Sequence, residues 1–134
     1  MTSTVTYLGD LRTNATHLAS KSGFITDAPI DNQGKGEAFS PTDTVATALA
    51  SCLLTIMGIK GDNLQVDLTG TTAAVTKVMG VEPRRIIEVK IDVTFLKGFD
   101  SKTQNLLERV ALTCPVANSL HPDLIQSITF NWPS

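Results

Sequence analysis

The only two cysteines of the chain, Cys52 and Cys114, are the side chains best suited to redox chemistry. Cys52 lies midway along an apolar stretch, and two interpretations of it remain open: a buried core cysteine or a reactive thiol. Burial in apolar surroundings raises the pKa of a thiol, so a reactive Cys52 needs a cation nearby. Its own segment supplies none, and its role therefore depends on another part of the chain.

Cys114 stands directly before Pro115, and this pair predicts a helix start with Cys114 as the N-cap. Free backbone N–H groups and the positive end of the helix would lower the pKa of its thiol. The alternative is a plain helix cap in a buried turn. On these arguments Cys114 is expected to be the more acidic thiol. Because the two cysteines are distant in sequence and form no CxxC motif, only the fold can bring them together.

The two histidines, His17 and His121, would complete a Cys2His2 zinc site with the cysteines. These four residues are scattered singly, whereas zinc ligands usually come in close pairs. We therefore expect neither a metal nor a cofactor. The segment His121-Pro122-Asp123 is expected to form a turn before the last strand, and Arg84 and Arg85 to form the solvated end of a hairpin.

The composition indicates one globular domain over residues 1–134, with 42% hydrophobic and 18% charged residues. A net charge of -2 lacks the basic excess of nucleic-acid-binding proteins. The first ten residues have neither the basic start nor the apolar run of a signal peptide. Two cysteines in a non-secreted chain favour a catalytic, metal-binding or buried role over a structural disulfide. We expect a cytoplasmic protein.

The strongest local signal is a helix start at Ser40-Pro41-Thr42-Asp43. It combines an N-cap serine, a proline at the first helical position and an acidic residue at the third. We expect a helix from Pro41 to about Ile59 that ends near Gly58 or Gly61. The helix is apolar on most faces and is expected to be central and covered on several sides.

The apolar stretch 45–59 is interrupted by polar residues, and we judge it too short and too polar to span a bilayer. A stripe of small residues recurs along it at helical spacing, which predicts that a second helix crosses there. The stripe consists of Thr44, Thr47, Ser51, Thr55 and Gly58.

Hydrophobic alternation predicts the remaining elements. Strands are expected at residues 2–8, 11–18, 23–27, 64–78, 85–96 and 125–130, with helices at 101–112 and after residue 114. The strand 85–96 is expected to place one set of apolar residues on a single face of a half-solvated antiparallel sheet. That set is Ile87, Val89, Ile91, Val93 and Phe95, with Ile86, Glu88, Lys90, Asp92 and Thr94 opposite. The order β-β-β-α-β-β-α-α-β is an α+β pattern.

Three segments resemble the OsmC/Ohr family of hydroperoxide reductases. Phe39-Ser40-Pro41-Thr42-Asp43, leading to Ala48-Leu49-Ala50-Ser51-Cys52, resembles the start of the family's central helix with its first cysteine. Cys114-Pro115-Val116-Ala117-Asn118-Ser119-Leu120 resembles the motif of the second cysteine. Tyr7-Leu8-Gly9-Asp10-Leu11-Arg12 resembles the N-terminal hairpin, where family members place an arginine. The likeness extends over nearly the whole chain.

The resemblance implies antiparallel sheets around a central buried helix, in a tightly intertwined homodimer with two sites at the subunit interface. It implies that Cys52 attacks an organic hydroperoxide and becomes a sulfenic acid, and that Cys114 condenses with it to a disulfide. A dithiol reductant then reopens the disulfide. Arg12 would stabilise the Cys52 thiolate. We follow this order of roles because an arginine contact in a dry site can outweigh a helix N-terminus worth about 0.3–1 kcal/mol.

One position departs from the family pattern, because Thr42 stands where peroxidase members carry the glutamate that orients the arginine. The neighbouring Asp43 is a candidate substitute, although it is also well placed as a helix cap. Helical rise puts Asp43 about 13 Å from Cys52 in the same chain, so its help would pass through Arg12 or a partner chain. Glu37 is a second candidate carboxylate.

Two functions remain open on the sequence. The first is a Cys-based peroxidase that acts on organic hydroperoxides through Cys52 and Cys114, with Arg12 and Asp43 in support. The second is a non-enzymatic member of the same fold, either a dimeric small-molecule binder or a thiol redox sensor, and it is motivated by Thr42. Neither involves nucleic acid or a membrane.

Overall fold

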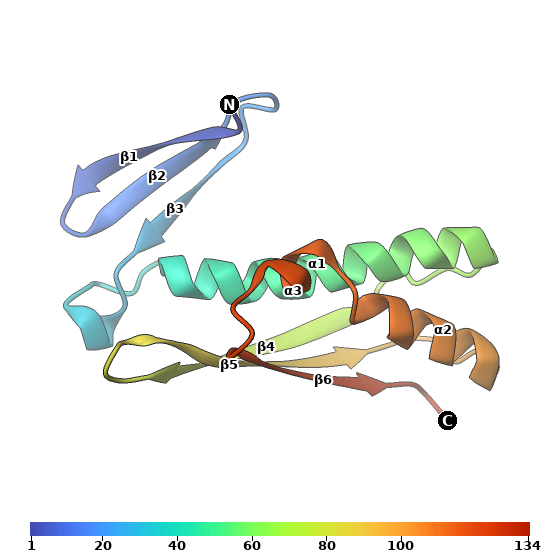
Figure 1. Ribbon diagram of the computed structural model, residues 1–134. Coiled ribbons are helices and arrows are strands. Elements are labelled where there is room, and N and C mark those ends of the chain that lie inside the picture. Colours follow the sequence, from blue (N-terminus) through green and yellow to red (C-terminus); the bar gives the residue numbers. More distant parts are fainter. The chain divides into compact units, whose positions relative to one another are not determined.

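The computed structural model describes residues 1–134, and its elements follow the predicted order with one added 3₁₀ helix, η1 (Ile30–Asn32) (Figure 1). The chain forms two compact units, Met1–Val45 and Ala46–Ser134. The boundary between them falls within the long helix α1 (Pro41–Leu64). The α+β class is confirmed, whereas one domain over residues 1–134 stays a prediction.

The first unit contains a three-stranded antiparallel sheet of β1 (Ser3–Gly9), β2 (Arg12–His17) and β3 (Gly23–Asp27). The predicted turn between β1 and β2 is present, and residues 9–11 all have positive φ angles there. The register places Arg12 of β2 opposite Asp27 of β3. Because side chains alternate across a strand, these opposed residues project from the same face of the sheet.

The start of α1 is as predicted, since Ser40 and Asp43 form a reciprocal capping box. The Asp43 N–H donates to Ser40 Oγ and the Ser40 N–H donates to Asp43 Oδ2, each over 3.0 Å. The predicted end near Ile59 is wrong, because the helix continues to Leu64. Gln65 takes the left-handed conformation (φ 59°), and the Val66 N–H closes the helix end on the Gly61 carbonyl at 2.9 Å.

The surroundings of α1 differ from prediction in one respect. Thr47, Ser51 and Thr55 are exposed, so the predicted helix crossing at the small-residue stripe is wrong for the single chain. The helix has 24 residues and contains an 18-residue window with a mean hydropathy of 1.5, so it passes a test for membrane spans that uses length and composition only. Core helices of globular domains pass the same test, and α1 buries a row of side chains in its own unit: Ala46, Leu49, Ala50, Leu53 and Met57.

The second unit contains a sheet in the order β4 (Thr72–Gly80), β5 (Arg85–Thr94) and β6 (Ile125–Asn131). β4 and β5 are antiparallel as predicted, but β6 pairs with β5 in parallel, so the sheet is mixed. The strand predicted at 64–78 begins only at Thr72, because α1 takes up its first residue and a loop follows. Figure 1 shows the helices of this unit on one face of the sheet.

Most of the predicted alternation is confirmed, since Val89, Ile91 and Val93 of β5 are buried, as is Phe95 directly after the strand. Ile86 is an exception and packs against the core. A shift of register between Val78 and Met79 gives β5 one extra residue and changes the alternation there. Arg85 also departs from expectation, because its Nη2 atom is buried without a hydrogen-bond partner and is therefore not solvated.

The remaining helices are α2 (Ser101–Ala111) and α3 (Pro115–Ser119), both close to the predicted positions. Asp100 caps α2 by accepting a hydrogen bond from the Thr103 N–H at 3.0 Å. Leu107 of α2 is fully buried in the core of the second unit. The turn predicted at residues 121–123 is present and leads toward β6.

Candidate functional site

Cys52 lies on α1 and is half-buried. Its side chain packs against the hydrophobic core of the second unit, whose buried members include Leu49, Leu53 and Cys114. Because helix positions one turn apart share a face, Cys52 sits at the margin of the row that α1 buries. The structure therefore gives this thiol a partly solvated position next to the core.

Cys114 is the N-cap of α3, as predicted, and is 0% exposed. Its Sγ atom accepts a hydrogen bond from the Ala117 N–H at 3.4 Å. Burial is the largest influence on this thiol and raises the pKa of Cys114, and the Ala117 and Val116 N–H groups offset it only in part. The expectation of an acidic Cys114 is therefore wrong, because desolvation exceeds the effect of a short helix N-terminus.

The fold brings the two cysteines together. Cys52 packs against the core cluster that contains Cys114, and its proximity contributes to the raised pKa of Cys114. Both residues belong to the unit Ala46–Ser134, and both are free thiols. A disulfide between them would therefore link two segments of one core, the middle of α1 and the start of α3.

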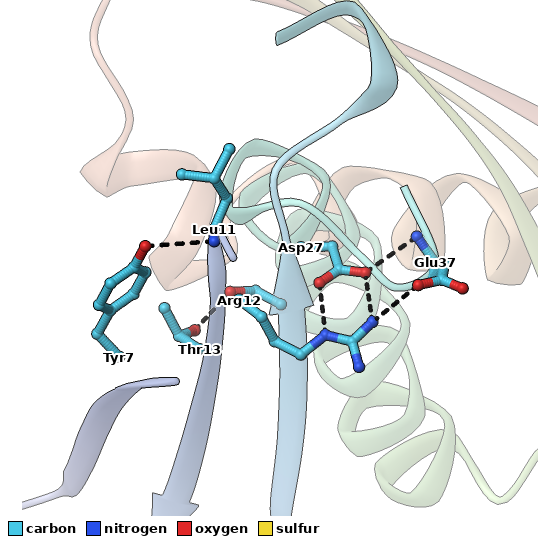
Figure 2. A network of polar contacts seen from close by, with 7 residues as sticks. Tyr7, Leu11, Arg12, Thr13, Asp27 and Glu37 are labelled. Atoms are coloured by element: carbon cyan, nitrogen blue, oxygen red, sulfur yellow. Dashed lines mark hydrogen bonds and ion pairs between the residues drawn. The ribbon is translucent and has the colours of Figure 1, made fainter. Parts of the chain in front are cut away.

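Arg12 forms a two-pronged ion pair in the first unit (Figure 2). Its Nε–H donates to Asp27 Oδ1 at 2.7 Å, and its Nη2 donates to Asp27 Oδ2 at 2.8 Å. Asp27 is 1% exposed. The hydrogen bond from Arg12 is the largest cause of the lowered pKa of Asp27 and outweighs the opposing effect of burial.

Glu37 approaches the same guanidinium from the loop before α1. Arg12 Nη2 donates to Glu37 Oε1 at 3.3 Å, and the Glu37 backbone N–H donates to Asp27 Oδ2 at 3.0 Å. Figure 2 shows the remaining guanidinium nitrogen, Nη1, pointing away from both carboxylates. This arrangement leaves the Nη1 edge of Arg12 open to an anionic group.

Sequence reasoning proposed Glu37 or Asp43 as the carboxylate beside Arg12 and missed Asp27. The structure places Glu37 there and assigns Asp43 to the capping box with Ser40. Thr42 lies in the same first turn, with its hydroxyl 3.2 Å from Ser40 Oγ. A signal for Asp27 existed, because antiparallel pairing of the strands predicted at 11–18 and 23–27 places it opposite Arg12.

The pattern that describes OsmC-like proteins matches residues 34–127, which include both cysteines and the whole of α1. The chain belongs to the OsmC-like family. A crystal structure from Psychrobacter arcticus 273-4, of a protein proposed to act in osmotic stress and detoxification response, is 60% identical. It has a TM-score of 0.95 and the match covers 97% of this chain and 95% of that one.

More distant OsmC-like structures share the fold. The organic hydroperoxide resistance protein OsmC of Legionella pneumophila has 15% identity and a TM-score of 0.72, over 98% of this chain and 97% of that one. A Vibrio cholerae protein proposed to confer organic hydroperoxide resistance, with captopril in one of its active sites, has 16% identity and a TM-score of 0.72. That match covers 98% of this chain and 92% of the other. No curated protein sequence matches this chain significantly.

The two thiols are expected to differ in reactivity. In Cys114→Ser, where Cys52 is the only thiol, iodoacetamide at pH 8 should alkylate the protein at least about tenfold faster than in Cys52→Ser. Cys114 is fully buried and its pKa is raised, so less of its reactive thiolate is present and accessible. Mass spectrometry of timed samples measures both rates, and urea-unfolded samples should show equal rates. Equal rates in the folded state would contradict the assignment.

The ion pair predicts an acid-dependent stability. Because the folded state lowers the pKa of Asp27, the unfolded state binds more protons and this contribution is lost as pH falls below about 4. The stability difference between wild type and Asp27→Asn should be largest at pH 6 to 7 and should shrink toward pH 3. Urea unfolding at several pH values measures it, with the exposed Asp92→Asn as a control. A stability difference between wild type and Asp27→Asn that does not change with pH would contradict a stabilising Arg12–Asp27 ion pair.

Proposed function

We propose that this OsmC-like protein is a thiol-dependent peroxidase that reduces organic hydroperoxides through Cys52 and Cys114. The observation that supports the proposal is that the two thiols share one core, in which Cys52 packs against the buried cluster that contains Cys114. A peroxidase of this kind needs one accessible thiol and a second one within reach. Half-buried Cys52 fits the first role and buried Cys114 the second.

In the proposed reaction the Cys52 thiolate attacks the outer oxygen of the hydroperoxide. An S–O bond forms and the O–O bond breaks, and the alkoxide leaves as an alcohol after taking up a proton. Cys52 is then a sulfenic acid, oxidised by two electrons. Attack by the Cys114 sulfur forms the disulfide and releases water. A dithiol returns two electrons by thiol–disulfide exchange and restores both thiols.

The high pKa of Cys114 supports this division of roles. A thiol that stays protonated does not compete for the peroxide, because the thiolate is the nucleophile. The charge of a Cys52 thiolate contributes to that raised pKa. This charge disappears when Cys52 becomes a sulfenic acid, because the sulfenic acid is neutral. We propose that loss of this charge makes Cys114 easier to deprotonate just when it is needed.

We propose that Arg12 supplies the positive charge for the Cys52 thiolate and for the leaving oxygen. Its open Nη1 edge and its fixed orientation on Asp27 support this role. In this scheme Asp27 orients Arg12, the task that the family glutamate at the position of Thr42 performs. A direct role for Asp43 in the reaction stays a prediction, in addition to its function as a helix cap. The working form is proposed to be an intertwined homodimer, as the sequence resemblance implies, and we propose that it acts in the cytoplasm.

A second function is favoured by one observation: Arg12 already contacts two carboxylates, Asp27 and Glu37. Two negative charges on one guanidinium weaken its attraction for a thiolate. If Arg12 is saturated in this way, the protein is instead a non-enzymatic binder or thiol redox sensor of the same fold.

Peroxide consumption distinguishes the two functions. With cumene hydroperoxide and dithiothreitol, wild type should turn over many equivalents, and Cys52→Ser should lose this activity. Cys114→Ser without dithiol should stop at a Cys52 sulfenic acid that dimedone traps. Arg12→Lys should lower kcat/KM by about 10²-fold, since fixed N–H donors are lost. Arg109→Lys, at an exposed site on α2, is the matched control.

Unchanged consumption by Cys52→Ser would contradict the peroxidase scheme. A wild-type protein that consumes no more than one equivalent of peroxide per chain would support the sensor instead.

A further inference from the structure

The guanidinium of Arg12 has two edges that can each hold a carboxylate, and the structure fills them very differently. The Nε/Nη2 edge carries Asp27 in two short hydrogen bonds of 2.7 and 2.8 Å. The Nη1/Nη2 edge carries Glu37 through a single contact of 3.3 Å from Nη2. A planar guanidinium prefers paired bonds to a carboxylate, so the second edge is only half used.

The two carboxylates also differ in how firmly they are held. The Asp27 side chain is 2% exposed, whereas that of Glu37 is 63% exposed. An exposed ion pair with one long contact contributes little and exchanges readily with water and other anions. Consistent with this, the bond to Asp27 is the largest cause of the raised pKa of Arg12, and Glu37 contributes less.

The backbone of Glu37 is nevertheless fixed in place. Its N–H donates to Asp27 Oδ2 at 3.0 Å, and the neighbouring strand end is held by the Asp27 N–H, which donates to the Phe39 carbonyl at 3.0 Å. The side chain of Glu37 can therefore leave the guanidinium while its backbone stays beside the site. Its carboxylate remains at high local concentration and returns when the edge is vacant.

The charges of the site follow from these contacts. One guanidinium faces two carboxylates, so the group of Arg12, Asp27 and Glu37 carries a net charge of about -1 at neutral pH. Two further residues act on it with opposite signs, Asp10 on Arg12 and Lys35 on Asp27. An arriving carboxylate therefore meets a site that is already negative, whereas a neutral ligand does not.

We propose that Glu37 is a selectivity residue, an internal competitor on the outer edge of Arg12 that disfavours ligands carrying a carboxylate. Its removal exposes the Nη1/Nη2 edge for paired hydrogen bonds to such a ligand. The consequence for peroxide selectivity rests on the proposed function, because it assumes that Arg12 faces the substrate. The binding consequence does not depend on peroxidase activity.

The binding test compares hexanoate with hexanamide, two probes that differ in charge at one end. The NMR signal of Arg12 Nε–H in full-length protein reports binding at the guanidinium. In Glu37→Gln the affinity for hexanoate, relative to hexanamide, should rise about three- to tenfold over wild type, because one negative charge near the edge is removed. Glu82→Gln removes an exposed glutamate in the other unit and should leave this ratio unchanged.

An unchanged hexanoate-to-hexanamide ratio in Glu37→Gln would overturn the proposal, as would hexanoate that fails to shift the Arg12 signal in that variant. An equal rise in Glu82→Gln would show a general charge effect and would also overturn it. In the double variant with Arg12→Lys, where the Arg12 signal is absent, hexanoate binding is followed on the NMR signals of hexanoate itself. Loss of that binding is the expected confirmation that the edge of Arg12 is the site.

A kinetic test separates this proposal from the proposed function. The KM of a carboxylate-bearing hydroperoxide, relative to that of its methyl ester, should fall about three- to tenfold in Glu37→Gln. If wild type turns over peroxide and the ratio does not move, the selectivity role alone is wrong. If no variant turns over peroxide but the hexanoate ratio rises, the peroxidase function is wrong and the selectivity role of Glu37 stands.

Discussion

The packing of one face of α1 against the sheet β4-β5-β6 determines where both cysteines lie. Leu49, Leu53 and Met57 are almost completely buried at this interface, each worth roughly 1.5–3 kcal/mol of transfer free energy. Cys114 is a fully buried member of the same core, and Cys52 lies at its margin. Because interiors are close-packed, neither thiol can move far without opening a cavity. The geometry of the pair is thus a consequence of core packing.

The first unit is organised around a buried charge rather than around apolar packing. A carboxylate as buried as Asp27 is costly unless it is paired, and the two bonds from Arg12 provide that pairing. The same bonds fix the plane of the guanidinium and determine which of its edges remains open. In this unit the ion pair of Arg12 with Asp27 therefore both compensates for the buried carboxylate and orients the guanidinium.

Local patterns in the sequence predicted local structure well. The start of α1 and the N-cap at Cys114 depend on residues that are neighbours in the chain, and both were found. The end of α1 was missed because Gln65, not a glycine, adopts the left-handed conformation. The parallel pairing of β6 was missed because it joins segments that are far apart in sequence, where a strand pattern carries no direction.

In the candidate site, too, the sequence predicted what local motifs determine and missed what tertiary contacts determine. The two cysteines and Arg12 were found from their motifs, but their environment was not. The acidity predicted for Cys114 considered only its own helix, whereas the deciding influence is desolvation by residues elsewhere in the chain. Asp27 was missed because its importance appears only when β2 and β3 are paired in register. Charge and burial are tertiary properties, and a sequence pattern reports them indirectly.

The most direct measurement is a peptide map of the reduced protein after one equivalent of cumene hydroperoxide, without reductant. Trypsin should place Cys52 in the peptide 36–60 and Cys114 in the peptide 110–134. The account predicts one dominant product, in which these two peptides are joined by a disulfide within a single chain. Cys52 left as a stable sulfenic or sulfinic acid, or joined mainly to Cys52 of another chain, would contradict the claim that the core pairs these two thiols for catalysis.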